Sequence, residues 1–372
     1  MIKKLKPIDY TLLFLLFSIC IAGMIMMYSA SSTVAIRNYE YSYDHFFRSQ
    51  LNTFCLGIIG LIFCIIIPFR IWKKRIVTLF IVVGSIILLF LVLWKGKVVN
   101  NAQSWIFGIQ PAEFIKLGTV VVIARFFSMR QELNKPIWYG SGKIILFVLT
   151  IFFLICKQPN LGSALLILAI ASSIFFCSGI NINYFIKKMV LTSILWIPFI
   201  YFLVKYGLSE VQMTRIKTVL DPFNDVQREG YQLVNSFIAI GSGGITGRGL
   251  GNSIQKTGYL PEPHTDFIMA IISEELGFFG VFIIIIGILT IVCCSFRIAQ
   301  KCKDLFGSLI AVGIGSMIGT QSVVNLGGIT GLLPLTGTPL PFVSFGGSSL
   351  MMNLMAMGIL LNISIFNNIR EI

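Results

Sequence analysis

Long apolar segments recur along the whole chain and limit its possible folds more than any other feature. Ten of them occupy residues 10–30, 48–68, 76–94, 110–129, 143–157, 160–180, 187–205, 267–296, 306–326 and 345–366. About 20 apolar residues in a helix cross the hydrocarbon core of a bilayer. Charged residues make up only 12% of the chain, about half the fraction usual in soluble domains. We therefore predict an all-α polytopic membrane protein, residues 1–372, with ten transmembrane helices in one domain.

Lysine and arginine residues predict the orientation of these helices, because they accumulate in cytoplasmic segments. With the N-terminus inside, sixteen of them fall in inner segments, whereas the short outer segments hold five, namely Arg37, Arg48, Lys95, Lys97 and Lys157. Both termini are therefore predicted to be cytoplasmic, with one large extracellular loop, about residues 206–265, between helices 7 and 8. The same anchoring by lysine and arginine explains the net charge of +14. A nucleic-acid partner is not predicted, because the sequence has no basic domain outside the membrane segments.

Three polar segments rich in glycine or proline fall on this outer face: residues 100–105, 206–265 and 327–344. Chemistry on that face is predicted to proceed without ATP, which the outer side lacks. The glycine-rich sequence GSGGITGRGLG, residues 241–251, matches neither the P-loop nor the dinucleotide-binding fingerprint. The eight cysteines show no C-x-x-C spacing, so neither a disulfide framework nor a cysteine metal site is predicted.

Ionisable residues inside apolar segments are energetically costly and mark candidate functional sites. Glu113 and Lys116 are three residues apart, so they share a helical face and can pair. Either they form a buried ion pair that holds helices together, or Lys116 faces a cavity and binds an anionic group while Glu113 holds it. Glu274 and Glu275 are adjacent, and one of them is expected to be protonated or paired with a neighbouring helix.

The sequence YLPEPHTDFIMA, residues 259–270, places Asp266 at the start of an apolar segment. Asp266 could be an ordinary acid at a helix N-terminus, with Thr265 as the cap, and the helix dipole would then help to keep its carboxylate ionised. Two features favour a catalytic role instead. His264 lies beside it, and proline fixes the backbone of residues 261–263, which suits rigid presentation of a reacting group.

Basic residues of the long loop offer positive charge to an anion. Arg248 lies among glycines whose backbone N–H groups could cradle a phosphate, and Arg215 lies earlier in the same loop. A basic, glycine-rich outer loop above buried carboxylates suits an anionic, lipid-linked substrate. Trp105 is interpreted either as an interfacial anchor or as a stacking platform for a sugar.

Six sequence motifs together resemble those of the shape, elongation, division and sporulation family, which includes FtsW, RodA and SpoVE. They are YSAS (28–31), NAQSWIFGIQPAEFIKL (101–117), KQPNLGSALLI (157–167), DPFND (221–225), the segment 230–277 and the segment 325–350. The resemblance covers nearly the whole chain, and its QKTGYLPEPHTDFIMA motif looks somewhat more like the FtsW branch. Ser104 and Asn160 stand where many members have arginine and aspartate, so neither is assigned a chemical role.

The resemblance implies a multi-pass enzyme of the bacterial cytoplasmic membrane, a peptidoglycan glycosyltransferase that polymerises lipid II on the outer face for cell division or cell-shape growth. Asp266 matches the family's essential aspartate and is expected to be the general base for an inverting displacement of lipid pyrophosphate. The expected substrate-binding residues are Trp105, Glu113, Lys116, Arg215, Arg248, Glu262 and His264.

The expected partners are lipid II, membrane lipid, a class B penicillin-binding transpeptidase and proteins of the division or elongation complex. No specific cofactor is predicted, although a divalent cation, Mg²⁺ or Mn²⁺, could join Arg215, Arg248 and Lys116 in stabilising the leaving pyrophosphate. Two alternatives remain open: a flippase that moves lipid II across the bilayer, and a non-catalytic scaffold for the transpeptidase. The flippase predicts its key acids near the membrane midplane, whereas Asp266 is predicted at the outer edge.

Overall fold

The computed structural model describes residues 9–99, 102–106, 108–134, 140–179, 210–224, 226–227 and 230–371. The helices that these residues form are α1 (Tyr10–Tyr39), α2 (His45–Ile66), α3 (Arg75–Lys95), α4 (Pro111–Glu132), α5 (Ser141–Cys156), α6 (Leu161–Cys177), α8 (Glu210–Leu220), α9 (Tyr231–Gly243), α10 (Ile268–Lys301), α11 (Leu305–Ile329) and α12 (Gly347–Glu371). Two short 3₁₀ helices are η2 (Phe69–Lys73) and η4 (Gln255–Thr257), and two strands are β1 (Lys97–Val99) and β2 (Ala102–Trp105).

Nine of the ten predicted apolar segments coincide with helices, and the seventh, residues 187–205, lies outside the described residues. Among the described helices, α1, α2, α3, α10, α11 and α12 have the length and hydropathy to cross a membrane. The apolar helices α5 and α6 are shorter, at 16 and 17 residues. These helices confirm the prediction of a mostly helical, multi-pass membrane protein.

Two features differ from the predicted fold. The chain is not strictly all-α, because β1 and β2 form an antiparallel hairpin in which Val99 pairs with Ala102. The segment 206–265, predicted as one long loop, contains α8, α9 and η4. The helix α9 has only 13 residues, so its apolar stretch is too short to be recognised as a membrane span. One face of α9, including Leu233 and Ala239, is buried.

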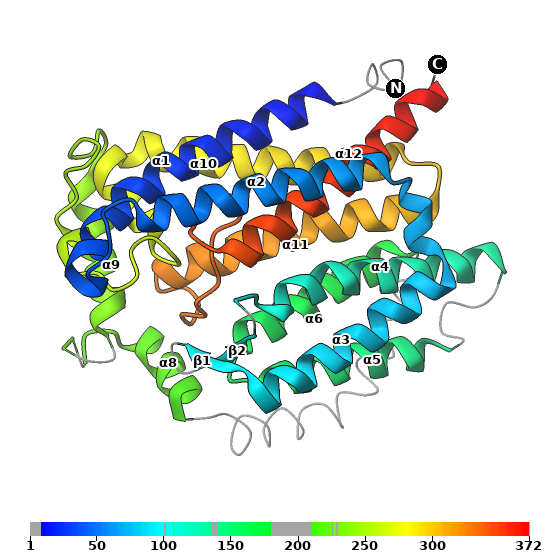
Figure 1. Cartoon of the computed structure of the whole chain (residues 1–372), viewed down its shortest axis with the longest axis horizontal. Coiled ribbons are helices and arrows are strands. Elements are labelled where there is room, and N and C mark those ends of the chain that lie inside the picture. Colours follow the sequence, from blue (N-terminus) through cyan, green and yellow to red (C-terminus); the bar gives the residue numbers. More distant parts are fainter. Residues whose placement is uncertain are drawn as a thin grey trace.

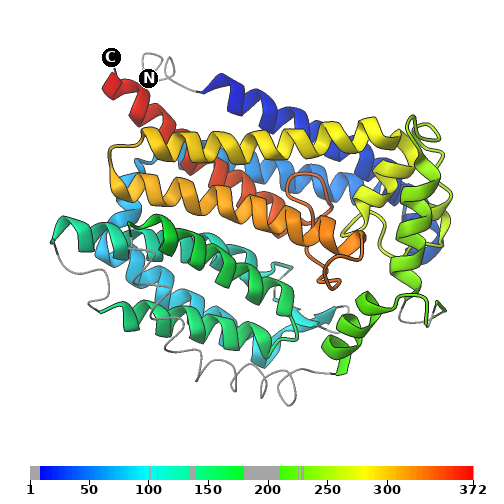
Figure 2. The ribbon, with the colours of Figure 1, turned by 180° about the vertical axis from the view of Figure 1, so that it is seen from behind.

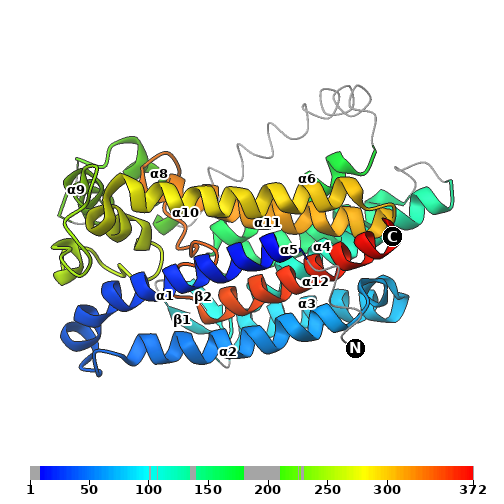
Figure 3. The same cartoon turned by 90° about the horizontal axis from the view of Figure 1, so that it is seen from above.

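The helices α11 and α12 lie at the centre of the bundle, with α4 and α6 on one side and α1, α2 and α10 on the other (Figures 1 and 2). Seen from above, α10 runs beside α11 and α2 runs beside α12 (Figure 3). Glycine permits this close packing, since a Cβ at Gly358 of α12 would lie 2.5 Å from the Leu61 carbonyl oxygen of α2. At the edge, α3 exposes Ile76 and Phe80, as a lipid-facing helix does.

The two ends of the bundle differ in content. The helix α1 begins and α12 ends at one end, whereas α8, α9 and the β1–β2 hairpin lie at the other (Figure 1). Irregular segments 258–267 and 330–346 also connect helices at that second end. Backbone N–H and C=O groups outside helices and strands need other hydrogen-bond partners. Side chains and loops therefore make specific contacts at this end of the bundle.

A kink in α10 receives the glycine-rich segment 244–257. Gly277 interrupts the helix with φ 63° and ψ −158°, a backbone conformation that favours glycine. The backbone N–H groups of Arg248 and Gly249 donate to the carbonyl oxygens of Glu274 and Glu275, each at 2.9 Å. The glycine-rich segment is therefore fixed against α10 immediately before the chain reaches residues 258–267.

Candidate active site

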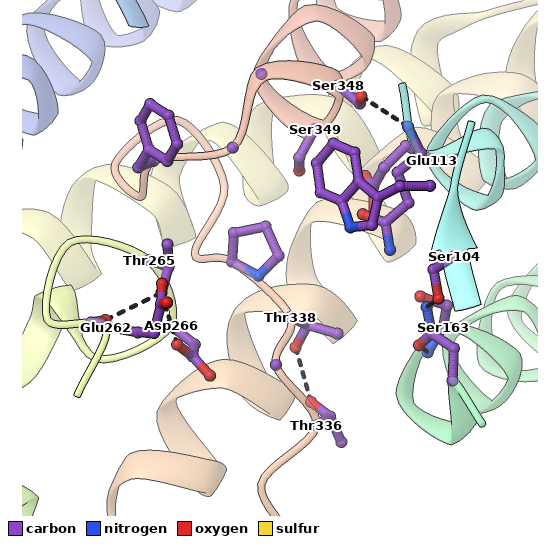
Figure 4. A pocket seen from close by; sticks show the side chains of 18 of the residues that line it. Ser104, Glu113, Ser163, Glu262, Thr265, Asp266, Thr336, Thr338, Ser348 and Ser349 are labelled. Carbon is purple, nitrogen blue, oxygen red and sulfur yellow. Dashed lines mark hydrogen bonds between the residues drawn. The ribbon is translucent and has the colours of Figure 1, made fainter. Parts of the chain in front are cut away.

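A cavity of about 380 Å³ opens among the irregular segments at the second end of the bundle. The described residues that line it are Tyr39, Tyr41, Phe46, Ser104, Trp105, Gln110, Glu113, Pro159, Asn160, Ser163, Arg215, Glu262, His264, Thr265, Asp266, Thr336, Gly337, Thr338, Pro339, Phe345, Gly346, Gly347, Ser348 and Ser349. Figure 4 shows Asp266 on one side of the cavity and Glu113 on the other. Of the predicted site residues, the structure brings Trp105, Glu113, Arg215, Glu262, His264 and Asp266 together here.

Asp266 lies in a turn that precedes α10. The Thr265 hydroxyl lies 2.8 Å from Asp266 Oδ1 and 3.0 Å from the Glu262 carbonyl oxygen, and can donate to either. The N-cap of α10 is Phe267, and no side chain caps that end of the helix. The interpretation of Thr265 as the cap of this helix is therefore wrong, and Asp266 lies immediately before the N-cap residue.

The carboxylate of Asp266 borders the open cavity. A Cβ at Gly337 would lie 3.9 Å from Asp266 Oδ2, so a glycine faces this oxygen and leaves room for a bound molecule. Burial is the main cause that raises the pKa of Asp266 above its ordinary value, and the hydrogen bond from Thr265 opposes it. The helix dipole, which was expected to lower this pKa, is therefore not the main influence on it. Because its pKa is raised, the ionised carboxylate is a stronger proton acceptor.

His264 is buried beside Asp266 and is surrounded by aromatic rings. Its ring centroid lies 4.5 Å from that of Phe46 and 5.5 Å from that of Phe345. Burial lowers the pKa of His264 to about 4, so its imidazole is neutral at pH 7. The Nδ1 atom has no hydrogen-bond partner in the part of the chain that the structure describes. His264 therefore offers the cavity an uncharged polar group.

Glu113 and Lys116 form a buried ion pair on α4. Lys116 Nζ lies 2.9 Å from Glu113 Oε2, and both side chains are at most 3% exposed. Lys116 Nζ also donates to Gln321 Oε1 at 2.7 Å. Glu113 lines the cavity, whereas Lys116 does not appear among the described lining residues. The pair joins α4 to α11, as the first interpretation expects, whereas the residue that faces the cavity is Glu113 and not Lys116, as the second interpretation had it.

Arg215, Glu262 and Trp105 enter the cavity from three separate segments. Arg215 of α8 donates from Nη1 to the Leu335 carbonyl oxygen at 3.2 Å. Glu262 accepts a hydrogen bond from the Tyr39 hydroxyl at 3.3 Å, and Trp105 is the last residue of β2. Among the described lining residues, Arg215 is the only lysine or arginine, so it supplies the positive charge that borders the cavity directly.

Arg248 lies away from the described cavity lining, and its side chain is 38% exposed. The phosphate cradle expected around it is not formed by the N–H groups of Arg248 and Gly249, because both donate to carbonyl oxygens of α10. The Arg248 side chain instead lies 3.8 Å from Glu274 Oε1. The glycines here serve backbone packing, which a sequence pattern cannot distinguish from anion binding.

Glu274 and Glu275 are both buried and both partnered. Glu274 accepts hydrogen bonds from the Ser253 hydroxyl at 2.5 Å and the Ile254 N–H at 3.0 Å. Glu275 lies 2.6 Å from Lys256 Nζ and accepts a bond from the Ser29 hydroxyl at 2.8 Å. Glu275 thus has a partner on a neighbouring helix, Ser29 of α1, as expected for one of the two acids, and the remaining partners of both acids belong to the glycine-rich segment.

Several uncharged polar residues of the cavity were not assigned a role from the sequence. Ser104 and Asn160 both line it, and Asn160 Nδ2 lies 3.4 Å from Ser104 Oγ. Thr336 and Thr338 enter from the segment 330–346, and their hydroxyls lie 2.9 Å apart. The polar, glycine- and proline-rich composition of residues 327–344 was the signal for this wall, although it named no single residue.

The cavity's chemistry follows from its own side chains. Within the residues that the structure describes, no three His, Cys, Asp or Glu side chains come together as ligands for a metal ion. The divalent cation considered from the sequence stays a prediction. A carboxylate with a raised pKa, a neutral imidazole, one arginine and many hydroxyl and amide groups are suited to proton transfer from a polyhydroxylated substrate.

Sequence comparison identifies relatives along the whole chain. A family profile described as cell cycle protein, covering FtsW, RodA and SpoVE, matches residues 10–369. The probable peptidoglycan glycosyltransferase FtsW of Bacillus subtilis (strain 168) is 42% identical over 371 residues, which cover 98% of this chain and 92% of the relative. The stage V sporulation protein E of the same organism is 36% identical, with 97% and 98% covered.

Solved structures have the same fold. A chain from a peptidoglycan synthase complex, reported for the structural coordination of polymerization and crosslinking, superimposes with a TM-score of 0.74 at 25% identity. The match covers 97% of this chain and 98% of that chain. The rod shape determining protein RodA of Thermus thermophilus superimposes with a TM-score of 0.68 at 24% identity, over 96% of each chain.

Proposed function

Because this chain belongs to the family of FtsW, RodA and SpoVE cell cycle proteins, we propose that it is a peptidoglycan glycosyltransferase that polymerises lipid II. The observation that carries the proposal is Asp266, a carboxylate of raised pKa that borders a polar cavity. The family resemblance and the FtsW relatives favour a role in cell division or cell-shape growth.

The proposed topology has ten transmembrane helices with both termini in the cytoplasm. The basic residues of the inner segments support this orientation. Since α1 begins and α12 ends at the bundle end opposite α8 and α9, the cavity would then open on the outer face of the bacterial cytoplasmic membrane. Lipid-linked disaccharide on that face would reach Asp266 without crossing the protein.

In the proposed reaction, Asp266 accepts the proton of a sugar 4-hydroxyl on one lipid II. The hydroxyl oxygen forms a bond to the anomeric carbon of the donor, on the face opposite the leaving group. The bond from that carbon to the pyrophosphate oxygen breaks, and the electron pair leaves with the lipid pyrophosphate. One base and one direct displacement invert the anomeric centre, and general-base catalysis contributes about 10²–10⁴-fold.

The other lining residues have supporting roles in this proposal. Arg215 stabilises the leaving pyrophosphate, because its positive charge borders the cavity. Trp105, Glu262 and His264 contact the sugar groups, and Lys116 acts through Glu113, to which it is paired. Arg248 is not among the described lining residues and its side chain is 38% exposed, so its proposed role is early attraction of the anionic substrate.

The lipid tail of the substrate is proposed to bind in a second, mostly apolar cavity of about 500 Å³. It lies between α6, α10 and α11 and includes Leu165, Leu289 and Val323 in its lining. Apolar side chains at membrane depth would accept a polyprenyl chain while the sugars remain in the polar cavity. A membrane-embedded transpeptidase is the proposed partner, supported by the synthase complex that shares this fold.

The test is polymerisation of lipid II by the purified protein together with its transpeptidase partner. Asp266→Asn is expected to fold and to bind the partner, but to lose about 10²–10⁴-fold in polymerisation rate. The matched control is Asp44→Asn, which removes a carboxylate that pairs with Arg48 outside the described cavity lining. Full polymerisation by Asp266→Asn would refute the base assignment.

The same assay separates the alternative functions. Transport of lipid II across vesicles, without glycan formation by the wild-type protein, would support a flippase. Partner binding with neither polymerisation nor transport would support a scaffold. Either result would overturn the proposed glycosyltransferase activity.

A further inference from the structure

Two amide side chains of α11 face the segment 330–346, which has no helix or strand of its own. Gln321 and Asn325 are one turn apart, so they lie on the same face of the helix. Gln321 Nε2 donates to the Pro339 carbonyl oxygen, and Asn325 Nδ2 donates to the Thr338 carbonyl oxygen, both at 2.8 Å. Both side chains are buried, at 0% and 4% exposure. Consecutive carbonyl groups of a cavity wall are thus fixed by consecutive turns of α11.

Asn325 also contacts the segment that carries Asp266. Its Nδ2 group donates to the backbone carbonyl oxygen of Asp266 at 2.8 Å, in addition to Thr338. With two carbonyl groups as acceptors, the NH₂ end of the amide must face them, and its orientation is fixed. Asn325 Oδ1 has no partner among the described residues. One buried side chain therefore joins the backbone of the proposed base to the opposite wall.

Gln321 makes the equivalent connection on the other side of the cavity. Its Oε1 atom accepts the hydrogen bond from Lys116 Nζ at 2.7 Å, and Lys116 pairs with Glu113. Its Nε2 group also lies 3.2 Å from Ser349 Oγ at the start of α12. Glu113 and Ser349 both line the cavity. Gln321 therefore joins the ion pair of α4 to the same wall that Asn325 joins to Asp266.

We propose that Gln321 and Asn325 are positioning residues that hold Asp266 and the Glu113–Lys116 pair in register across the cavity, through the Thr338 and Pro339 carbonyl groups. This inference rests on the proposed glycosyltransferase function. Neither amide lines the cavity among the described residues, so neither touches substrate. Their effect is geometric: an in-line displacement requires the base and the groups that hold the donor at a fixed separation, and a displacement of about 1 Å costs roughly 10²-fold in rate.

The test compares Asn325→Ala and Asn325→Asp with a control at the other end of the bundle. Asn325→Asp keeps the size of the side chain but replaces the donating NH₂ group with an oxygen that faces two carbonyl oxygens. The control is Asn362→Ala, because Asn362 also joins backbone segments, donating to Ile65 and accepting from the Phe69 N–H. Asn362 is 13 residues beyond Ser349 on α12, about 20 Å along the helix.

Both Asn325 variants are expected to lower kcat for lipid II polymerisation by about 10–10²-fold per folded molecule, with KM changed less than about threefold. In Asn325→Ala, which adds no charge, the acid limb of the pH–rate profile is expected to move to lower pH, because a loosened turn lets water reach the Asp266 carboxyl. The charged groups that face Asp266 are Glu262 of the same turn and Arg215 of α8, and both remain in these variants. Asn362→Ala should lower the unfolding temperature without changing kcat per folded molecule or the pH profile.

Two outcomes would overturn the inference. Unchanged kcat and pH profile in both Asn325 variants would show that the amide does not position the base. An equal loss of kcat in Asn362→Ala would show that any loosening of the bundle has this effect. Both comparisons require a wild-type protein that polymerises lipid II, so an inactive wild type refutes the proposed function, whereas active Asn325 variants refute only this inference.

Discussion

Two groups of carboxylates lie near the same end of α10 and differ in how their oxygen atoms are used. Glu274 and Glu275 are 1% and 0% exposed, and hydroxyl, backbone N–H and ammonium groups satisfy them. Asp266, eight residues before Glu274, accepts a hydrogen bond from its neighbour Thr265 and borders an open cavity. The oxygen atoms of Glu274 and Glu275 are bound to other groups of the protein, whereas Asp266 has an oxygen that faces the cavity.

This difference teaches that burial of an acid in an apolar segment does not by itself mark a reaction centre. An acid with complete internal partners stabilises a particular backbone arrangement, here the attachment of the glycine-rich segment to α10. Asp266 has no ion-pair partner among the residues that the structure describes, so its carboxylate keeps an acceptor oxygen, and burial raises its pKa. The number of internal partners, rather than depth, separates the two groups.

The largest expected effect is a loss of stability when one of the fully partnered acids, Glu275, is replaced. Glu275→Leu leaves the ammonium of Lys256 buried without its partner, which should lower the free energy of unfolding by about 3–5 kcal/mol. The double variant Lys256→Met with Glu275→Leu removes both charges and should recover most of that loss. Unfolding in detergent measures the stability, and lipid II polymerisation per folded molecule should stay close to wild type in the double variant.

The exposed pair Arg48–Asp44 supplies the contrast for this measurement, since the Arg48 side chain is 75% exposed. Arg48→Ala should leave the unfolding midpoint nearly unchanged. Loss of polymerisation in the stable double variant would contradict the comparison, because it would give Glu275 a catalytic role.

A smaller effect is expected at the kink of α10. In Gly277→Ala, the new Cβ would lie 2.4 Å from the Gly247 backbone nitrogen, at a φ of +63° that alanine adopts only under strain. The free energy of unfolding should fall by about 1–3 kcal/mol. Gly84→Ala in α3 is the matched control, because its Cβ would meet no atom of the described residues within 4 Å. Equal unfolding midpoints for the two variants would show that the glycine-rich segment is not fixed by this kink.

The sequence predicted the helices well and the contacts of the irregular segments poorly. Hydropathy is a local property, so nine apolar segments were sufficient to place nine helices. The motif around residues 259–270 also indicated Asp266, because rigid proline residues and a histidine surround it. The partners of Arg248 could not be predicted, since a glycine-rich segment that binds an anion and one that packs on a helix have the same composition.

Long-range contacts explain the remaining differences. The pKa of Asp266 depends on enclosure by segments as distant as residues 39–46 and 336–349, which no local pattern reports. Gln321 and Asn325 lie in an apolar helix and carry no charge, so their sequence gives no signal of the carbonyl groups that they hold. Topology brings these residues together, and only the folded chain shows which polar groups remain unpartnered.

The smallest expected effect is a pH dependence in which activity and stability change in opposite directions. Because the folded-state pKa of Asp266 is raised above its ordinary value of 3.8, the folded protein holds this proton more tightly than the unfolded chain. The stability contributed by Asp266 is therefore present at low pH and is lost as the pH rises through the raised pKa. In the proposed reaction the base is the ionised Asp266 carboxylate, so the polymerisation rate should increase over the same interval.

The measurement follows the polymerisation rate and the unfolding midpoint of the wild type and of Asp266→Asn from about pH 4 upward. In Asp266→Asn, the part of the pH dependence of stability that comes from the Asp266 carboxyl should be absent. His264 adds no limb between about pH 5 and 8, because its pKa is lowered to about 4. A contribution of Asp266 to stability that increases with pH would mean that its pKa is lowered, as a helix N-terminus would lower it, and would contradict the burial argument for Asp266.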